Sequence, residues 1–528
     1  MWYFFSMTHN LNNGPDRPPV TKYYLELDPP TGDDPVADLD RLLRALVKVG
    51  VEDVTVPLFV AAKVPGALKA GGYKVTAAVS APPLPTLLAV QPGDTTARKL
   101  GLAVDLGTTN VVGALVDMIT GETLSERSEL NPQTAIGEDI LTRIHHCLRP
   151  GGLEELQACA VSCISSIAEG LAMQAGCAPD DILCVSVAGN TTMAHLLLGL
   201  DPYNICRAPY IPVANSFGPV RARDIGLAVA PEAPVFVLPN VGSYVGGDVL
   251  AGVLVSGMTA REDISLLVDI GTNAEIVVGN RDWLLVGAGA AGPALEGGVV
   301  RFGMRATNGA IDRVVIDPSS FEPSFTVIGG SAPVGLCGSA LIDLLAELFT
   351  TGLIDGRGRF SDPSKSARIV ELDGKYAYVV ARLRESGSAT DIIFSETDIE
   401  NLVRTKAAMY TALSVVTREL GVAFSELADF FIAGTFGAYI AADKALAIGM
   451  VPDIDLSKYK LLGNSSLTGA VRVLTSTGAL QEIGRIARMI TYKEMNVSSD
   501  FMSEFRAAMF LPHTDEGLFR SAKKRERA

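Results

Sequence analysis

The sequence lacks cysteines at disulfide or metal-binding spacing. It contains seven, an odd number, and no two of them are spaced as CxxC. They are Cys147, Cys159, Cys163, Cys177, Cys184, Cys206 and Cys337. The N-terminal residues show no signal-peptide pattern, so we expect free thiols in a reducing compartment, the cytoplasm.

Basic charge and long apolar runs are also scarce. The chain has 44 Lys and Arg against 59 Asp and Glu, a net charge of −15. Nucleic acids and anionic membranes bind clustered basic residues, and the only basic run, 523–527, is typical of a solvated tail. No apolar run reaches the ~18 residues that suggest a membrane span. We therefore expect neither nucleic acid nor membrane as a partner.

A common nucleotide-binding pattern is missing. Without GxxxxGK[ST], the sequence excludes a P-loop site. Instead, short apolar strands alternate with long helical stretches over 101–480, which is typical of an α/β fold. The predicted strands are GLAVDLG, DILCVSVAG, APVFVLPNV, ISLLVDIG and DFFIAG, and the predicted long helices cover 153–175, 334–351 and 396–420.

A smaller α/β unit precedes this region. YYLEL (23–27) and YKVTAAVS (73–80) predict strands, and apolar residues within 39–47 recur at helical spacing. A Pro-rich stretch follows. We divide the chain into a disordered tail (1–20), a small α/β domain (21–82), a linker (83–100), a first lobe (101–264), a second lobe (265–480) and a C-terminal segment that packs back on the core (481–528).

The two lobes are predicted from an internal repeat. GLAVDLGTTNVVGALVD (101–117) resembles SLLVDIGTNAEIVVGN (265–280), because each has an apolar strand, an Asp-aliphatic-Gly-Thr turn and a second apolar run. One copy is weak evidence, since strands often end in Asp and hairpins often turn on Gly. Two copies favour a shared function for Asp105 and Asp269.

Both turns carry groups suited to phosphate. A glycine in a tight hairpin lets backbone N–H groups approach an anion, and a strand-end aspartate is a hard oxygen ligand for Mg²⁺ or its waters. We therefore predict Asp105 and Asp269 as catalytic residues that bind Mg²⁺ through water. The surrounding residues predicted to bind nucleotide are Gly107, Thr108, Thr109, Asn110, Gly271, Thr272 and Asn273.

Two further turns extend the pattern. FIAGTFG (431–437) is a strand followed by a short turn between glycines, which suits a nucleotide base and ribose, although an ordinary αβ turn is the alternative. VAGNTTMAH (187–195) is a strand end, a polar turn and a helix start with Asn190 or Thr191 as the cap. The residues added to the predicted nucleotide site are Asn190, Thr191, Gly434, Thr435, Phe436 and Gly437.

The order of these elements resembles the acetate kinase, sugar kinase, heat-shock chaperone and actin (ASKHA) superfamily of ATPases, which implies a two-lobed actin-like, ribonuclease H-like core. More specifically, GLAVDLGTTN, VAGNTTMAHLLLG, VDIGTNAEIVVG, AGPALEGG, GLCGSALIDLLA, FIAGTFGAYI and FMSEFRAAMFLPHTD together resemble the reductive activators of corrinoid proteins. KYYLELDPPTGDDPVADLDRLLRAL resembles that family's middle domain. The resemblance spans roughly residues 20–515.

The resemblance implies an ATP-dependent activity. Corrinoid methyl-transfer proteins, such as those of O-demethylation and one-carbon metabolism, cycle through Co(I), and an activator uses ATP and a low-potential electron to return Co(II) to Co(I). It implies that the 105–110 turn holds Mg²⁺ and phosphate, that the 269–273 turn holds the γ-phosphate and orients water, and that ATP closes the cleft between the lobes. The implied partner is a corrinoid protein, and family dimers suggest a homodimer.

The cysteines depart from the family pattern. Family members carry an iron–sulfur cluster, usually in an N-terminal ferredoxin-like domain with four cysteines. The first cysteine here is Cys147, so we expect no iron–sulfur cluster in this chain and a separate ferredoxin-like electron donor. Cys159 and Cys163 share a helix face and are interpreted as small buried residues, with metal binding as the alternative.

Two other functions fit the same superfamily. A small-molecule kinase would need a catalytic Asp and a substrate pocket, and a binding or chaperone module would use nucleotide only as a switch. The glycine-rich loop 287–298 and the helix start at 335–339 are further candidates for ligand or partner contacts.

Overall fold

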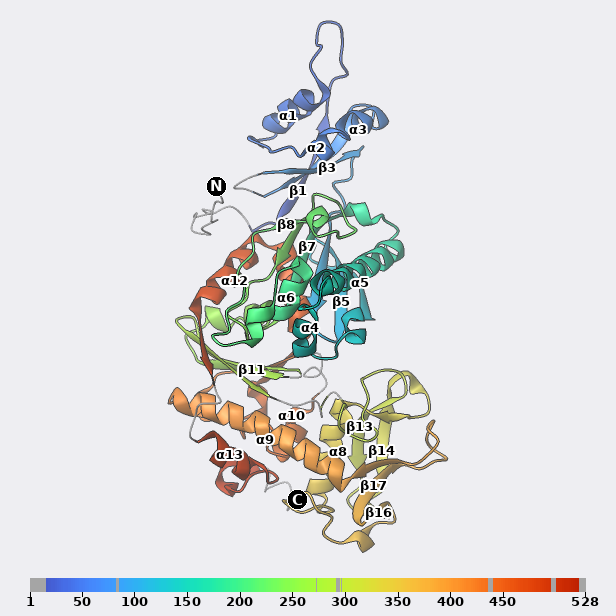
Figure 1. Cartoon of the computed structure of the whole chain (residues 1–528), viewed down its shortest axis with the longest axis vertical. Helices are drawn as coiled ribbons and strands as arrows, with labels where there is room; N and C mark the ends of the chain where they lie inside the picture. The colour runs from blue at the N-terminus through green and yellow to red at the C-terminus, as the bar shows by residue number, and fades with distance from the viewer. Residues whose placement is uncertain are drawn as a thin grey trace. The chain divides into compact units, whose positions relative to one another are not determined.

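The computed structural model describes residues 16–81, 85–271, 273–290, 295, 297–434, 440–494 and 500–521. Two compact units make up the chain (Figure 1). The first comprises Met1–Val255 and Ser465–Met489, and the second comprises Ser256–Asn464 and Ile490–Ala528. The sequence assigned residues through 480 to the second lobe, whereas the structure returns Ser465–Met489 to the first unit.

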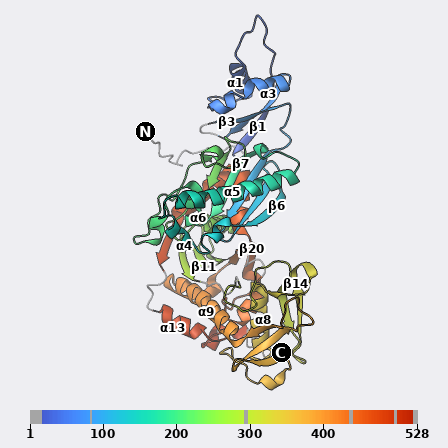
Figure 2. The ribbon, with the colours of Figure 1, turned by 45° about the vertical axis from the view of Figure 1, so that its right-hand side comes forward.

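A small α/β domain lies at the start of the first unit. Its antiparallel sheet has the order β1-β2-β3 and carries its helices on one face (Figure 2). The elements are β1 (Val20–Glu26), β2 (Lys74–Ser80), β3 (Leu87–Pro92), α1 (Asp38–Lys48), α2 (Leu58–Ala61) and α3 (Val64–Ala70). Helix α1 buries Leu42 and Leu46 in the core of this domain. The segment predicted as a linker therefore contributes a strand, β3.

The predicted tail is ordered in its last residues. Asp16 accepts hydrogen bonds from Ser476 Oγ at 2.6 Å and from the Gly478 N–H at 3.1 Å. The Thr477 N–H donates to the Arg17 carbonyl at 2.9 Å. Residues 16 and 17 are therefore attached to the start of a helix of the same unit, and the tail prediction is wrong for them.

The main sheet of the first unit has the order β6-β5-β4-β7-β9-β8. Strands β4, β5 and β6 form an antiparallel meander, and β7 and β9 continue the sheet parallel to β4. The strands are β4 (Leu100–Leu106), β5 (Asn110–Asp117), β6 (Thr123–Leu130), β7 (Ile182–Gly189), β8 (Val220–Arg221) and β9 (Pro234–Val237). The helices are α4 (Ile140–His146), α5 (Gly152–Gln174), α6 (Thr191–Leu198), α7 (Gly247–Ser256), α11 (Ser465–Thr475) and α12 (Thr477–Met489).

The second unit repeats this topology. Its sheet has the order β20-β19-β10-β11-β12-β21, with an antiparallel meander β10, β11, β12 and with β19 and β20 parallel to β10. The strands are β10 (Ser265–Ile270), β11 (Asn273–Gly279), β12 (Leu284–Ala290), β19 (Phe430–Ala433), β20 (Tyr459–Gly463) and β21 (Ile490–Glu494). Strands β4, β5, β6, β7 and β9 thus correspond to β10, β11, β12, β19 and β20. The internal repeat is a duplicated five-stranded sheet.

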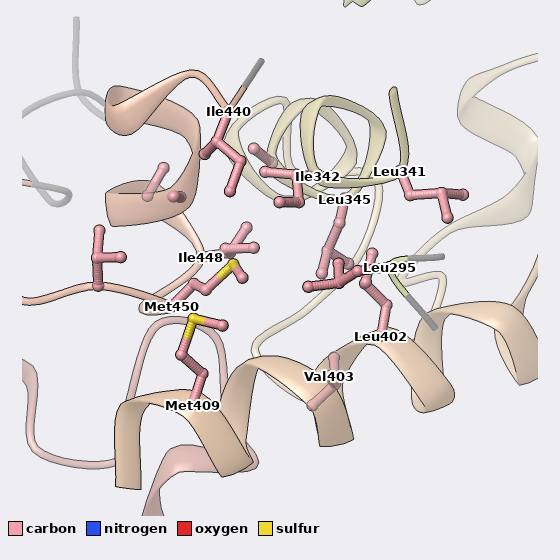
Figure 3. Close-up of a cluster of buried hydrophobic side chains, with 14 of the residues drawn as sticks. Leu295, Leu341, Ile342, Leu345, Leu402, Val403, Met409, Ile440, Ile448 and Met450 are labelled. Atoms are coloured by element: carbon pink, nitrogen blue, oxygen red, sulfur yellow. The ribbon is translucent and has the colours of Figure 1, made fainter. Parts of the chain in front are cut away.

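The second unit carries two additional three-stranded sheets and its own apolar core. The sheets are β14-β13-β15 and β16-β17-β18. Their strands are β13 (Ala310–Ile316), β14 (Pro323–Val327), β15 (Gly335–Leu336), β16 (Ile369–Leu372), β17 (Lys375–Ala381) and β18 (Ile392–Ser395), and the remaining helices are α8 (Gly338–Thr350), α9 (Glu396–Glu419), α10 (Ala442–Ala447) and α13 (Phe501–Ala508). Side chains of α8, α9 and the segment around α10 point toward one another in Figure 3.

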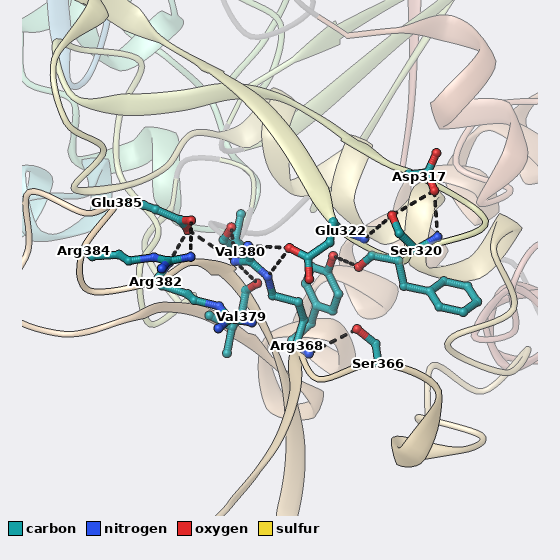
Figure 4. A network of polar contacts seen from close by, with 12 residues as sticks. Asp317, Ser320, Glu322, Ser366, Arg368, Val379, Val380, Arg382, Arg384 and Glu385 are labelled. Carbon is teal, nitrogen blue, oxygen red and sulfur yellow. Dashed lines mark hydrogen bonds and ion pairs between the residues drawn. The ribbon is translucent and has the colours of Figure 1, made fainter.

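A buried arginine joins the two small sheets. Arg368 forms ion pairs with Glu322 at 2.7 Å and with Glu385 at 3.4 Å (Figure 4). It is only 5% exposed. Because an unpaired buried charge is costly, this arginine needs its two carboxylates to be stable in the interior. The predicted helix start at 335–339 is the β15–α8 connection, where Ser339 Oγ donates to the Asp312 carbonyl.

Helix α5 has the length and hydropathy of a membrane span, and half of its most apolar window is buried. It packs against β5 and β6 of the first unit. We interpret α5 as a core helix of the first unit.

Candidate nucleotide site

The first predicted turn joins β4 to β5. Asp105 is half-buried, whereas the β4 residues before it are buried. A Cβ on Gly107 would lie 2.5 Å from the Asn110 carbonyl oxygen, so only glycine fits this position. The turn residues Gly107, Thr108 and Thr109 remain partly exposed. This arrangement leaves a narrow backbone turn at the end of a buried strand.

The carbonyl oxygens of this turn are held by donors from the fold. The Asn131 side chain donates to the Gly107 carbonyl and its backbone N–H to the Thr109 carbonyl, both at 2.9 Å. Arg143 Nη2 donates to the Thr108 carbonyl at 2.6 Å. Neither Asn131 nor Arg143 was predicted. Both residues come after the hairpin in the chain, and their contacts with it are visible only in the folded structure.

Asn190 connects the β7 turn to this hairpin. Its side-chain oxygen accepts the Met193 N–H at 2.9 Å, which confirms it as the cap of α6, and its amide donates to Thr108 Oγ1 at 3.0 Å. Thr191 is buried and donates through Oγ1 to the Gly242 carbonyl at 3.0 Å. The Thr191 hydroxyl therefore holds the loop before α7, while Asn190 contacts the hairpin directly.

The sequence analysis missed Asp248, the second residue of α7. Burial, and to a lesser degree the charge of Asp105, raises the pKa of Asp248 to about 6, although the Val249 N–H donates to its Oδ1 at 2.8 Å and opposes the shift. A carboxyl with such a pKa is partly protonated near neutral pH, which is typical of functional sites. The only sequence signal was the Gly-Gly-Asp at a helix start.

Ser466 was also missed. It is the second residue of α11, and its hydroxyl donates to Asp105 Oδ1 at 2.9 Å. Helix α11 follows β20 as α7 follows β9, so Ser466 corresponds in the repeat to Asp248. Gly469 of α11 packs on α7, since a Cβ on it would lie 2.5 Å from that of Ala251. Two equivalent helices thus supply side chains to one aspartate.

The second predicted turn joins β10 to β11 in the second unit. Asp269 is half-buried, as Asp105 is, and it lies directly opposite Glu275 in the antiparallel pair. Directly opposite residues share one face of a sheet, so two carboxylates stand side by side there. Gly271 is exposed and Asn273 begins β11. Thr272 lies outside the described residues.

Gly434 follows β19, the strand beside β10, and lies close to Asp269. Its φ is 93°, and a Cβ would lie 2.6 Å from the Ile270 carbonyl oxygen and 2.8 Å from Asp269 Oδ1. In the first unit, likewise, a Cβ on Gly189 would lie 2.8 Å from the Leu106 carbonyl oxygen. The predicted adenosine turn is therefore the repeat of the Asn190 turn. Thr435, Phe436 and Gly437 lie outside the described residues.

The glycine-rich loop predicted at 287–298 begins within β12 and follows the second hairpin. Residues 291–294 and 296 of this loop lie outside the described residues. Its possible contact with a ligand or a partner therefore stays a prediction.

The donor set fits Mg²⁺ better than a soft metal. Each predicted aspartate has a second carboxylate nearby, Asp248 in one unit and Glu275 in the other, and Mg²⁺ uses one or two carboxylates with waters and substrate phosphates. The described parts of the chain contain no group of three His, Cys, Asp or Glu that could hold a metal ion. Burial raises the pKa of Cys147 and Cys163 to about 11, which disfavours the thiolate form that binds metals.

Comparison with known proteins agrees with this architecture. The C-terminal domain of RACo, the ASKHA domain, matches residues 263–523, the RACo middle region matches 100–261 and the RACo linker region matches 12–97. The small domain, which we expected to match the middle domain, therefore matches the linker region, and the middle region is the first lobe.

The similar proteins include two curated relatives and a solved structure. The corrinoid activation enzyme RamQ of Eubacterium limosum is 33% identical over 77% of this chain and 69% of its own length. A reductase of the Co(II) methylated amine-specific corrinoid protein from Methanosarcina barkeri is 24% identical over 74% and 73%. The structure of a reductive activator for a corrinoid, iron–sulfur protein is 40% identical, with a TM-score of 0.87, over 96% of this chain and 81% of that one.

The duplicated sheet and its paired Asp-aliphatic-Gly-Thr hairpins place the protein in the ASKHA fold class. Within that class, the chain belongs to the RACo family of corrinoid-protein activators.

Proposed function

We propose that this protein is an ATP-dependent activator that returns the cobalt of a corrinoid protein from Co(II) to Co(I). The observation that carries the proposal is the duplicated hairpin, with a strand-end aspartate and a glycine-restricted turn in each unit. Family membership supports the corrinoid protein as the partner, because the similar proteins are named for that activity.

The residues of the first unit have separate tasks. The 107–109 turn presents backbone N–H groups to phosphate, and Asp105 supplies a carboxylate for Mg²⁺. Bound Mg²⁺ would neutralise phosphate charge. Asp248 is suited to orient the attacking water or to accept its proton, since its pKa of about 6 lies near working pH. Ser466 fixes the orientation of the Asp105 carboxylate.

The residues of the second unit supply the matching set. Asp269 and Glu275 contribute carboxylates, and Gly434 allows the β19 turn to pass close to Asp269. We assign Asp269, Gly271, Thr272 and Asn273 to ATP, as the sequence predicts, and Gly434, Thr435, Phe436 and Gly437 to the adenosine.

We further propose that a separate low-potential protein supplies the electron. The seven thiols are free, and burial raises the pKa of Cys147 and Cys163 to about 11, which disfavours the thiolate form that a cluster needs. A cytoplasmic site of action, a homodimer and a partner in O-demethylation or related one-carbon metabolism also remain proposals, supported by the free thiols and by the family resemblance.

The test measures two outputs with one corrinoid protein. ATP hydrolysis is followed with and without the Co(II) corrinoid protein, and Co(I) formation is followed by its visible spectrum with a reduced ferredoxin as donor. We expect Co(I) to form only when ATP, donor and this protein are all present. An ATP hydrolysis rate that does not change when the corrinoid protein is added, together with no formation of Co(I), would reject the proposal. Phosphorylation of a metabolite would favour the kinase alternative.

A further inference from the structure

Arg143 of α4 is fully buried and contacts only neutral acceptors. Its Nε donates to the Gly137 carbonyl at 2.8 Å, and its Nη1 donates to Gln133 Oε1 at 3.0 Å. Its Nη2 donates to the Thr108 carbonyl at 2.6 Å. No carboxylate within the described ranges forms an ion pair with it. Burial lowers the pKa of this guanidinium to about 10, so the group stays charged at neutral pH.

This arrangement differs from that of two other buried arginines. Arg368 is paired with Glu322 and Glu385, and Arg41 is paired with Asp34 at 2.5 Å. A buried cation without an ion pair is costly, and the charge of Asp139 offsets the burial of Arg143 only in part. Arg143 lies directly behind the phosphate turn, so an anion on the other side of that turn would supply further compensating charge.

The hydrogen bond to the Thr108 carbonyl also fixes the direction of a backbone amide. In a planar trans peptide the C=O and the following N–H point in opposite directions. Because Arg143 holds the Thr108 carbonyl on the interior side, the Thr109 N–H points away from Arg143. Asn131 acts in the same way on the Gly107 carbonyl, which turns the Thr108 N–H outward. The turn therefore presents successive N–H groups on one side, as anion sites do.

We propose that Arg143 is a positioning residue for nucleotide phosphate: it holds the Thr108 carbonyl inside so that the turn's N–H groups face the phosphates, whose negative charge its own charge balances. This inference rests on the proposed ATP-binding function. It predicts that Arg143 affects the binding of phosphate groups but not of the nucleoside.

The experiment compares ADP with adenosine on full-length variants. Arg143→Gln removes both the positive charge and the several N–H donors of the guanidinium. Arg143→Lys keeps the charge but not the planar set of donors. Arg41→Gln is the matched control, since it removes a buried guanidinium that donates to backbone carbonyls of Asp28 and Asp34 in the same unit. Isothermal titration gives both affinities, and thermal unfolding shows whether each variant is folded.

We expect Arg143→Gln to lower the affinity for ADP by about ten- to a hundred-fold, which is the scale of one charge-assisted hydrogen bond. The affinity for adenosine should be unchanged. Arg143→Lys should lie between that variant and the parent protein, and Arg41→Gln should bind both ligands normally. Unchanged ADP affinity in a folded Arg143 variant, or equal losses for ADP and adenosine, would overturn the inference. If Arg143→Gln fails to fold, Arg143→Lys decides. Failure of the parent protein to bind ADP would instead reject the proposed function.

Discussion

Replacing Asp248 with asparagine should make the protein more stable and less active. Burial and the charge of Asp105 raise the pKa of Asp248 to about 6, whereas an unfolded aspartate titrates near 4. Between those values the native state binds more protons than the unfolded state, so the free energy of unfolding falls as pH rises through this window. At pH 7 the raised pKa of Asp248 lowers the free energy of unfolding by at most about 3 kcal/mol. The asparagine side chain keeps an oxygen for the Val249 N–H but carries no charge.

The assay is chemical denaturation of parent protein and Asp248→Asn at several pH values. We expect the variant to be about 1–3 kcal/mol more stable at pH 7, with the gap closing toward pH 4. Asp33→Asn is the control, because Asp33 is exposed and its replacement should shift stability at pH 7 by less than about 0.5 kcal/mol.

The same variant tests the role of the carboxylate in hydrolysis. If Asp248 accepts a proton from water, the variant should hydrolyse ATP at least ~100-fold more slowly while still binding it. A variant that is less stable than the parent at pH 7 would refute the pKa argument. A variant with normal hydrolysis would remove Asp248 from the site, whatever its stability.

Three further perturbations follow from the structure. Asp105→Ala and Asp269→Ala should each abolish ATP hydrolysis while leaving the circular dichroism spectrum intact, and normal turnover in both would reject the phosphate assignment. Gly434→Ala should lower the stability of the second unit by about 1–3 kcal/mol, because φ is 93° and the Ile270 carbonyl oxygen lies 2.6 Å from the new Cβ; unaltered thermal unfolding would contradict this. Burial lowers the pKa of Lys406 well below its ordinary value. The unfolded state therefore binds one proton more than the native state below ~10, the pKa of an unfolded lysine. As pH rises from 7 toward ~10, the free energy of unfolding of the parent should increase relative to that of Lys406→Met. Denaturation at both pH values would check the sign, and a pH-independent difference would contradict it.

The fold could be predicted because its local signals agree with each other. Apolar strands that end in Gly, Pro or Asn appear as β4, β7, β9, β10 and β19, and the three long helices lie within a few residues of their predicted ranges. The Asp-aliphatic-Gly-Thr turn is encoded within a few consecutive residues, so its repetition was visible without any tertiary contact. The resulting duplication correctly predicted two similar α/β lobes.

The rest of the site depends on contacts between distant segments. Asp248 and Ser466 occupy helix starts whose neighbours are set by how α7 and α11 pack, and the Ser466 contact joins residues far apart in the chain. No local pattern indicated that 465–489 returns to the first unit. The sequence did not single out Arg143, because burial is decided by the whole fold and not by the residue type.

The repeat also explains why its two halves differ in chemistry. In the first unit Asp105 lies opposite Val112 in the antiparallel pair, and its second carboxylate comes from the α7 helix start. In the second unit Asp269 lies opposite Glu275, so the second carboxylate comes from the neighbouring strand. The second carboxylate therefore reaches the equivalent aspartate from a helix start in one unit and from a strand in the other. The duplicated scaffold therefore keeps one glycine-restricted turn per unit, while burial at the helix start of the first unit raises the pKa of Asp248 to about 6.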